Sequence, residues 1–300
     1  MVQTRRNPEV ILERCRALAL FLILLPLPGG AADAARKPLM LPGLLVDIQT
    51  PDGWTLKAKH LPSKEGKATY LLLHGTGQRK EDWYYLARGL AGWGYGYLAI
   101  DFRGHGESVV GPDGQPASWK KFNSSKSYNE FANMARDVEG GVAYLTGLGA
   151  LEEQIGVIGA DVGSSIGLKY AAVHPKVPLV IMLSPGLSYQ EVLTVNAMRA
   201  YKNRPILMIH SAADKYSTRA TPLLAGFAKL SAGENNTTVI TVAQEHGTKM
   251  LRRQRELIGQ IIDWIKNPVK NPEVAVSTEA APSGEPFPLP AEDPGSSPDQ

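Results

Sequence analysis

Between about residues 39 and 266, short apolar runs of β type alternate with segments of helical periodicity, and this alternation constrains the fold more than any other feature. The runs 44–50 and 54–61, separated by the turn sequence PDG, predict an opening hairpin. Further strands are expected at 70–75, 95–101, 154–159, 178–184, 204–210 and 237–242, with helices at 82–94, 129–148, 162–174, 189–201, 221–231 and 248–266. Continuous apolar strands separated by helices predict an α/β fold, a mostly parallel, doubly wound sheet of about eight strands.

The two ends of the chain differ from this central domain, which we place at 35–266. Residues 1–34 combine basic residues, the apolar run 17–28 and an A-x-A sequence ending at Ala34, and this pattern predicts a cleaved signal peptide and a secreted or periplasmic protein. An uncleaved membrane anchor is the alternative. Residues 267–300 are acidic and rich in proline, which predicts a disordered tail.

Composition excludes several classes of function. The single cysteine, Cys15, lies in the predicted signal peptide, so we expect no disulfide and no cysteine nucleophile in the mature chain. A formal charge of +3 without blocks of like charge argues against nucleic acid and against stable membrane association after cleavage. No group of residues has metal-ligand spacing, so we expect neither metal nor cofactor. The oligomeric state is not indicated.

The segment GADVG, residues 159–163, follows a predicted strand and precedes a predicted helix. Its spacing is that of a nucleophile elbow, G-x-S-x-G, but Asp161 stands where a serine is expected. In a parallel sheet, functional residues are expected in the loops at the carboxyl ends of the strands. Asp214 and His246 follow two later strands, so the chain order is elbow, acid and histidine.

Five segments in this order, HGTG, DFRGHGES, GADVG, SAAD and EHG, resemble the α/β-hydrolase superfamily over about residues 45–266, most closely its small bacterial esterase and dienelactone-hydrolase-type members. The resemblance implies hydrolysis of a small-molecule substrate without a cofactor. It also implies that the backbone N–H groups of Thr76 and Val162 form the oxyanion hole, that His246 is the base and that Asp214 orients it. The chain departs from these relatives at Asp161.

An aspartate at the elbow leaves three functions open. We expect an esterase-like hydrolase that works through Asp161. A non-catalytic binding protein, in which Asp161 and His246 form a static ion pair, is the first alternative. The second is a dehalogenase or epoxide hydrolase, in which Asp161 attacks a saturated carbon and His246 activates water against the resulting ester. Such enzymes commonly have a tryptophan after the nucleophile and a large cap, whereas here Val162 follows and the connection 185–203 predicts only a minimal lid.

Several other residues are weaker candidates. Tyr189 could protonate a leaving oxygen or simply pack, and Trp83 could line the pocket or the core. Residues 109–128 could form a small lid. We expect His74 and His105 to be structural, holding the loops in which they lie.

Overall fold

The computed structural model describes residues 40–125 and 128–268 of the 300-residue chain. The predicted signal peptide (1–34) and all but the first two residues of the predicted tail (267–300) lie outside the described residues, so both remain predictions. No helix within the described ranges is both long enough and apolar enough to cross a membrane.

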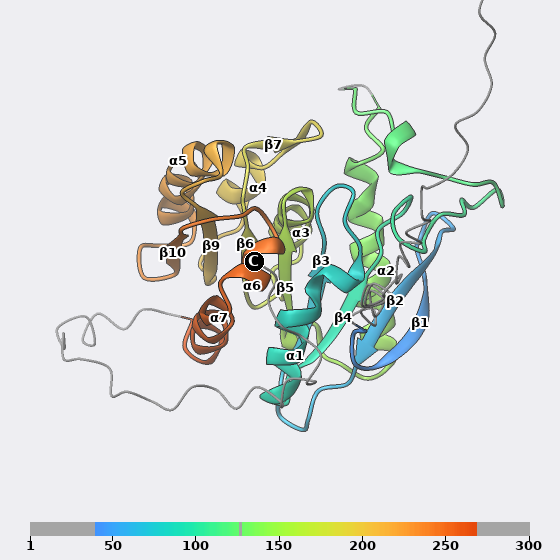
Figure 1. The fold of residues 1–300 in the computed structure, drawn as a ribbon, viewed down its shortest axis with the longest axis horizontal. Coiled ribbons are helices and arrows are strands. Elements are labelled where there is room, and N and C mark those ends of the chain that lie inside the picture. The colour runs from blue at the N-terminus through green and yellow to red at the C-terminus, as the bar shows by residue number, and fades with distance from the viewer. Residues whose placement is uncertain (1–39, 126–127, 269–300) are drawn as a thin grey trace, which may run out of the picture. The chain divides into compact units, whose positions relative to one another are not determined.

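An eight-stranded sheet organises the domain, as the sequence predicts (Figure 1). Its strands, in chain order, are β1 (Leu44–Gln49), β2 (Thr55–Leu61), β3 (Thr69–Leu73), β4 (Gly96–Ile100), β5 (Ile155–Ala160), β6 (Val180–Leu183), β9 (Ile206–Ser211) and β10 (Thr237–Val242). Their order across the sheet is β1-β2-β4-β3-β5-β6-β9-β10. β2 is antiparallel to both of its neighbours, and all other adjacent pairs are parallel.

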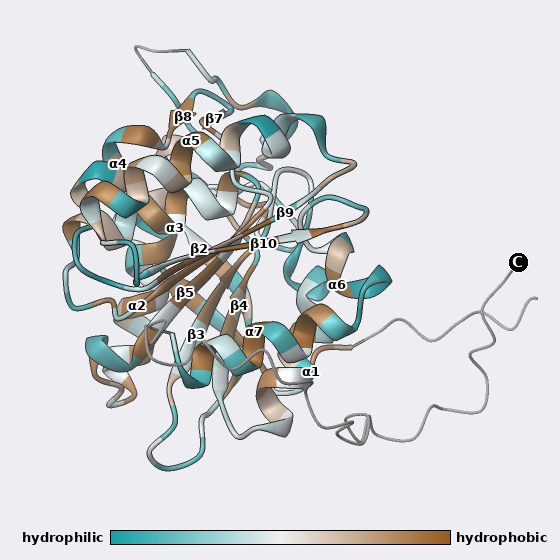
Figure 2. Cartoon of the chain, turned by 90° about the vertical axis from the view of Figure 1, so that its left-hand side faces the viewer, coloured by the Kyte–Doolittle hydropathy of each residue, from teal (hydrophilic) through white to brown (hydrophobic). Residues whose placement is uncertain are grey.

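Helices cover both faces of the sheet (Figure 2). They are α1 (Tyr84–Gly92), α2 (Ala135–Gly147), α3 (Val162–Val173), α4 (Val195–Ala200), α5 (Lys215–Ser231), α6 (Lys249–Arg253) and α7 (Glu256–Lys266). Side chains of α1, α6 and α7 share one buried apolar cluster with the sheet, and side chains of α2, α3, α4 and α5 share the other. Two apolar layers, one on each face, explain why the central strands are apolar at every position.

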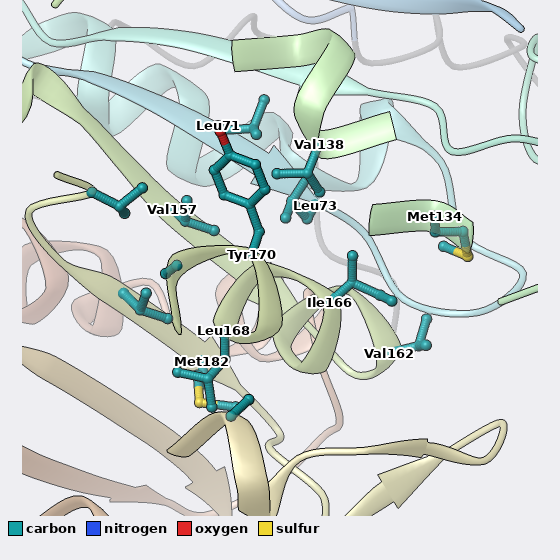
Figure 3. Packing of buried hydrophobic residues seen from close by; sticks show 14 of the residues in the cluster. Leu71, Leu73, Met134, Val138, Val157, Val162, Ile166, Leu168, Tyr170 and Met182 are labelled. Atoms are coloured by element: carbon teal, nitrogen blue, oxygen red, sulfur yellow. The ribbon is translucent and has the colours of Figure 1, made fainter. Parts of the chain in front are cut away.

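α3 lies at the centre of the second cluster, directly after the elbow. Every residue of β3 and β5 is buried, and Ile166 and Tyr170 of α3 share a buried cluster with Leu73 and Val157 from these strands (Figure 3). Burying a side chain of this size contributes roughly 1.5–3 kcal/mol. The helix that carries the elbow is therefore anchored along its length by the core.

Three predicted helices differ in the structure. Segment 189–201 contains a two-stranded hairpin, β7 (Ser188–Tyr189) and β8 (Val192–Leu193), before the short α4, because Gln190 and Glu191 both adopt positive φ and turn the chain back. α5 begins at Lys215 rather than residue 221, since the Asp214 carboxylate caps it by accepting the Ser217 N–H at 3.1 Å.

The predicted helix 248–266 is divided into α6 and α7 at Gln254, where φ is −125° and ψ is 79°. The Gln254 side chain accepts the Ala243 N–H at 3.0 Å and donates to the Gln244 carbonyl at 2.8 Å. These bonds tie the break to the loop after β10. The helix is therefore interrupted at Gln254, whose side chain holds the loop that carries His246.

Candidate active site

The elbow has the backbone geometry that its glycines predict. Asp161 has φ 53° and ψ −125°, a conformation that is strained for a residue with a side chain. A Cβ on Gly159 would lie 2.4 Å from the Gly163 carbonyl oxygen, and a Cβ on Gly163 would lie 2.3 Å from that of Leu73. Both positions therefore require glycine, and the sharp turn projects Asp161 from the end of β5.

The loop after β3 lies against the elbow. A Cβ on Gly75 would meet the Asp161 Cβ at 2.8 Å, so the loop backbone passes directly beside the carboxylate. The side-chain oxygen of Gln78 accepts the Gly75 N–H at 3.0 Å and holds this approach. The backbone N–H groups of Thr76 and Val162, predicted as oxyanion donors, donate to no group within the described ranges. They remain available to a ligand.

Asp214 and His246 meet as the chain order predicts. Asp214 follows β9 and His246 follows β10, and these strands are adjacent in the sheet. His246 Nδ1 lies 2.6 Å from Asp214 Oδ2, and Nε2 lies 3.7 Å from Asp161 Oδ2. Glu245, which precedes the histidine, has φ 75° and is paired with Arg253 at 3.3 Å. Two carboxylates thus flank one imidazole, at its two nitrogens.

These carboxylates stabilise the protonated imidazole. The carboxylate of Asp161 raises the pKa of His246 above its ordinary value of 6.5; partial burial opposes this, and Asp214 adds to it. Burial disfavours the ionised form of Asp214, but the hydrogen bonds from His246 and from the Ser217 N–H hold its pKa below the usual range. The free site therefore favours an imidazolium between two carboxylates up to a higher pH than an isolated histidine would.

The contribution of His246 to the stability of the folded protein decreases as the pH rises. Because its pKa in the folded state is raised, the stabilisation is complete below about pH 6.5 and is lost as the pH rises through the folded value.

We expect Asp161→Asn to lower the pKa of His246, as measured by NMR titration of its ring protons. His74 and His105, with pKa values of about 3 and 4 caused mainly by burial, are expected to stay neutral above pH 5 in both proteins. An unchanged His246 pKa in the variant would contradict this electrostatic account.

Ser184 is a residue of the site that the sequence patterns did not predict. This buried residue follows β6 with φ 48°, and its hydroxyl oxygen accepts the Gly247 N–H at 2.8 Å. It therefore fixes the backbone directly after His246. The sequence feature that could have indicated this role is a small polar residue at the carboxyl end of a strand, immediately before Pro185.

Tyr189 lies against the site. Its ring centroid is 6.2 Å from that of His246, in an edge-to-face arrangement. Its hydroxyl donates to the Ser184 carbonyl at 3.0 Å, and burial raises its pKa, with Asp161 adding to the effect. The residue thus borders the imidazole while its proton is engaged by the backbone. A role as proton donor stays a prediction.

Trp83 and Trp119 have different positions. Trp83 has no exposed surface and packs in the cluster beneath α1 and α7, so in this structure it belongs to the core and offers no surface to a ligand. Trp119, in the predicted lid 109–128, stacks on the His105 ring with centroids 5.5 Å apart. A Cβ on Gly77 would lie 2.9 Å from the Trp119 ring. Trp119 therefore covers the loop after β3.

His74 and His105 have the structural contacts predicted for them. His74 Nδ1 bonds the Gly75 carbonyl at 2.8 Å and its Nε2 accepts the Phe102 N–H at 3.1 Å. His105 Nδ1 bonds the Arg103 carbonyl at 2.9 Å, so Nε2 is left as an acceptor. Four buried side-chain polar atoms lack a hydrogen-bond partner in the described part of the chain: Thr76 Oγ1, Trp83 Nε1, His105 Nε2 and Asp161 Oδ1. Three of these residues lie in the loops that surround or form the elbow.

The site is open to solvent. A hollow of about 510 Å³ beside Asp214 and His246 is bordered by α5 and the loop after β10. The connection from β6 to β9 holds only β7, β8 and α4, which agrees with the predicted minimal lid. Within the described ranges, no three His, Cys, Asp or Glu side chains are grouped so that they could hold a metal ion.

Solved structures share this fold. The chain resembles an esterase from Pyrococcus furiosus (TM-score 0.60, 17% identity, 78% of this chain and 94% of that one). It also resembles a dienelactone hydrolase from Anabaena variabilis (0.58, 15%, 76% and 98%) and a thermostable carboxyl esterase from Bacillus coagulans (0.59, 13%, 75% and 98%). At such identities the likeness shows the fold alone. No curated protein sequence matches the chain.

A family comparison agrees with the fold. The model of the alpha/beta hydrolase fold matches residues 71–236, which is more than half of the chain. The matched range includes Asp161 and Asp214 and ends before His246. The sheet order, the elbow and the chain order of acid and histidine also match the α/β-hydrolase fold. The chain therefore belongs to the α/β-hydrolase fold family.

Proposed function

We propose that the protein is a hydrolase of small molecules in which Asp161, His246 and Asp214 carry out the reaction. One observation carries the proposal: the strained elbow holds Asp161 3.7 Å from His246 Nε2, while Asp214 holds Nδ1 at 2.6 Å. This is the alignment of nucleophile, base and orienting acid in a serine hydrolase, with a carboxylate in place of the hydroxyl. The esterase-like relatives support hydrolysis in general.

The carboxylate favours one kind of bond. Attack by Asp161 on an acyl carbon would form a mixed anhydride, from which carboxylate is the better leaving group, so the step would reverse. Attack on a saturated carbon that bears a leaving group forms an alkyl ester instead, and the leaving group departs with the bonding electrons. Asp161 Oδ1 is buried without a hydrogen-bond partner in the described residues, and this poor solvation raises the energy of the free carboxylate.

The second step, hydrolysis of the alkyl ester, depends on the loss of the Asp161 charge. Forming the ester removes the negative charge of Asp161, which is the largest cause of the raised His246 pKa. The pKa of His246 therefore falls, and the imidazolium releases its proton to the anionic leaving group or to solvent. The neutral ring can then take a proton from water as the water attacks the ester carbonyl. The N–H groups of Thr76 and Val162 would hold the developing oxyanion. On collapse of this intermediate, His246 gives the proton that it took from water to the departing alkoxide, which releases the alcohol and regenerates the Asp161 carboxylate.

A binding function is the second candidate. Because the flanking carboxylates raise the His246 pKa, they also favour a stable ion pair between His246 and Asp161, which is what a non-catalytic relative would retain. The open hollow and the short connection between β6 and β9 are compatible with such a binding function, because neither encloses a bound substrate.

The test compares the full chain with Asp161→Asn, Asp161→Ser and His246→Ala on short acyl esters, haloalkanoates and epoxides, with intact-mass detection of adducts. Turnover is expected to fall roughly 10³-fold or more in Asp161→Asn, because the amide is no nucleophile. His246→Ala is expected to accumulate a covalent ester, because the first step does not need a base. Native inactivity together with ester hydrolysis by Asp161→Ser would contradict the proposal and indicate binding.

Secretion is part of the proposal and rests on the sequence of residues 1–34 alone. We expect the protein isolated from its natural host to begin near residue 35. The measurement is the intact mass or the N-terminal sequence of that protein. An N-terminus at Met1 on a membrane-bound protein would favour the anchor instead.

A further inference from the structure

A second hollow adjoins the one beside His246. Its volume is about 370 Å³, and it is lined by Leu187, Lys215, Tyr216, Arg219, Ala220 and Leu223. It shares Lys215 and Tyr216 with the hollow that contains His246. The two hollows therefore adjoin at these two side chains, and we call them together the groove; its lining extends from His246 to Leu223, over about the first two and a half turns of α5.

The Tyr216 ring, which lines both hollows, is held in place by the backbone and by a second aromatic ring, that of Tyr189. The rings of Tyr189 and Tyr216 meet edge to face at 5.1 Å, and Tyr189 borders His246. The Tyr216 hydroxyl accepts the Ser188 N–H at 2.9 Å and donates to the Ser188 carbonyl at 2.7 Å. A Cβ on Gly186 would lie 2.4 Å from the Tyr189 ring and 2.6 Å from the Tyr216 ring, so glycine allows the rings to meet. The apolar surface is thus preformed.

Three cationic side chains border the groove. Lys215 and Arg219 lie on α5, and Lys249 begins α6, three residues after His246. All three are exposed, and none forms an ion pair with any residue in the described ranges. The carboxylates of the groove are already engaged, since Asp214 bonds His246 and Glu245 pairs with Arg253. An apolar groove with unpaired cations on its border favours an amphiphilic anion.

We infer that the substrate has an anionic group, a carboxylate or a phosphate, on an apolar body. The apolar body lies along Tyr216, Leu187 and Leu223, and the anionic group lies among Lys215, Arg219 and Lys249. The reacting carbon lies toward His246 and Asp161. This inference rests on the proposed function for the reacting end, whereas the binding preference is a property of the groove and can be measured without turnover.

The test measures equilibrium binding of 4-phenylbutyrate, 4-phenylbutyl phosphate and the neutral isostere 4-phenylbutanamide to the full chain. Calorimetry gives the affinity, and amide shifts at Tyr216 and Leu223 locate the ligand. We expect at least one anion to bind roughly tenfold more tightly than the amide, because three exposed ion pairs each contribute modestly. The preference is expected to shrink as salt screens the charges. Whether the carboxylate or the phosphate is preferred identifies the anionic group.

Two triple variants separate this site from general charge effects. Lys215→Gln/Arg219→Gln/Lys249→Gln is expected to abolish the preference and leave amide binding unchanged. The control, Lys64→Gln/Lys176→Gln/Lys202→Gln, removes the same charge from exposed lysines in the loops that precede β3, β6 and β9, at the opposite edge of the sheet. It is expected to retain the preference.

The outcomes distinguish this inference from the proposed function. Equal binding of anions and amide, no binding of any probe, or a preference that survives the first triple variant would overturn the inference. Selective binding of an anion without turnover of any substrate would support the inference and contradict the hydrolase. Turnover of a substrate without selective binding of an anion would support the hydrolase and contradict the inference.

Discussion

Replacement of Gly163 by alanine is expected to destabilise the protein by about 3 kcal/mol. The new Cβ would lie 2.3 Å from the Leu73 carbonyl oxygen and 2.5 Å from that of His74. Both oxygens belong to backbone at the end of β3, the neighbour of β5 in the sheet, so neither can rotate away. α3 would have to move off the sheet, and the packing of Ile166 and its neighbours would be lost. Urea unfolding, followed by circular dichroism, measures the loss.

Gly226→Ala is the matched control for this prediction. Gly226 lies within α5, and a Cβ there would meet nothing within 4 Å. Alanine at such a position is expected to stabilise the helix by roughly 0.5–1 kcal/mol. If Gly163→Ala lost less than about 1 kcal/mol on the same scale, the contact between α3 and β3 would not be what holds the elbow in place.

Replacement of Asp137 by alanine is expected to destabilise the protein by about 3–5 kcal/mol. Asp137 is fully buried at the start of α2 and accepts both the backbone N–H of Arg103, at 2.9 Å, and its guanidinium Nε, at 2.7 Å. Arg103 is itself 4% exposed and also binds Asp52. Removing Asp137 leaves a buried donor unpaired and a guanidinium with half of its partners. Urea unfolding measures this loss as well.

An exposed ion pair serves as the control. Lys57 and Asp47 are 2.7 Å apart but lie on the exposed surface of β2 and β1. Asp47→Ala is expected to change the free energy of unfolding by at most about 1 kcal/mol, because water solvates both groups. Equal losses for the two variants would show that the burial of the Arg103 network does not set its energetic importance.

The Arg103 network clarifies what the segment DFRGHGES does in this chain. Asp101 is buried and accepts the backbone N–H and the ammonium of Lys80, each at 2.7 Å. Together with the Arg103–Asp137 pair, it holds the loops after β3 and β4 beside each other. His105 lies between them and under Trp119. These charged residues therefore position the loop of Thr76 and take no part in the proposed chemistry themselves.

The site could be predicted from local patterns because each of its residues follows a strand. The order of strands, elbow, acid and histidine predicts that Asp161, Asp214 and His246 lie together, and the structure brings them together where β5, β9 and β10 end. Residues whose roles depend on contacts between distant segments were harder to predict. Ser184 gave only a weak signal, since its partner, Gly247, is 63 residues away. For Trp83 the sequence left both the pocket and the core open, because sequence position alone cannot show which side chains are buried, and the structure places it in the core.

The sequence by itself determined the α/β class, the eight strands and the elbow, because hydrophobic period and glycine spacing are local properties that act through backbone sterics. The start of α5 at Lys215 and the turn at Gln190 depend on a local cap at Asp214 and on positive φ angles, which hydrophobic periodicity does not show. The break at Gln254 was decided by tertiary contacts, the side-chain bonds to the loop after β10. The tertiary structure also decided the arrangement of charged groups in the site. Only the folded chain brings two carboxylates to one imidazole, and Coulomb interactions at 2.6 and 3.7 Å exist only between residues that packing has brought together.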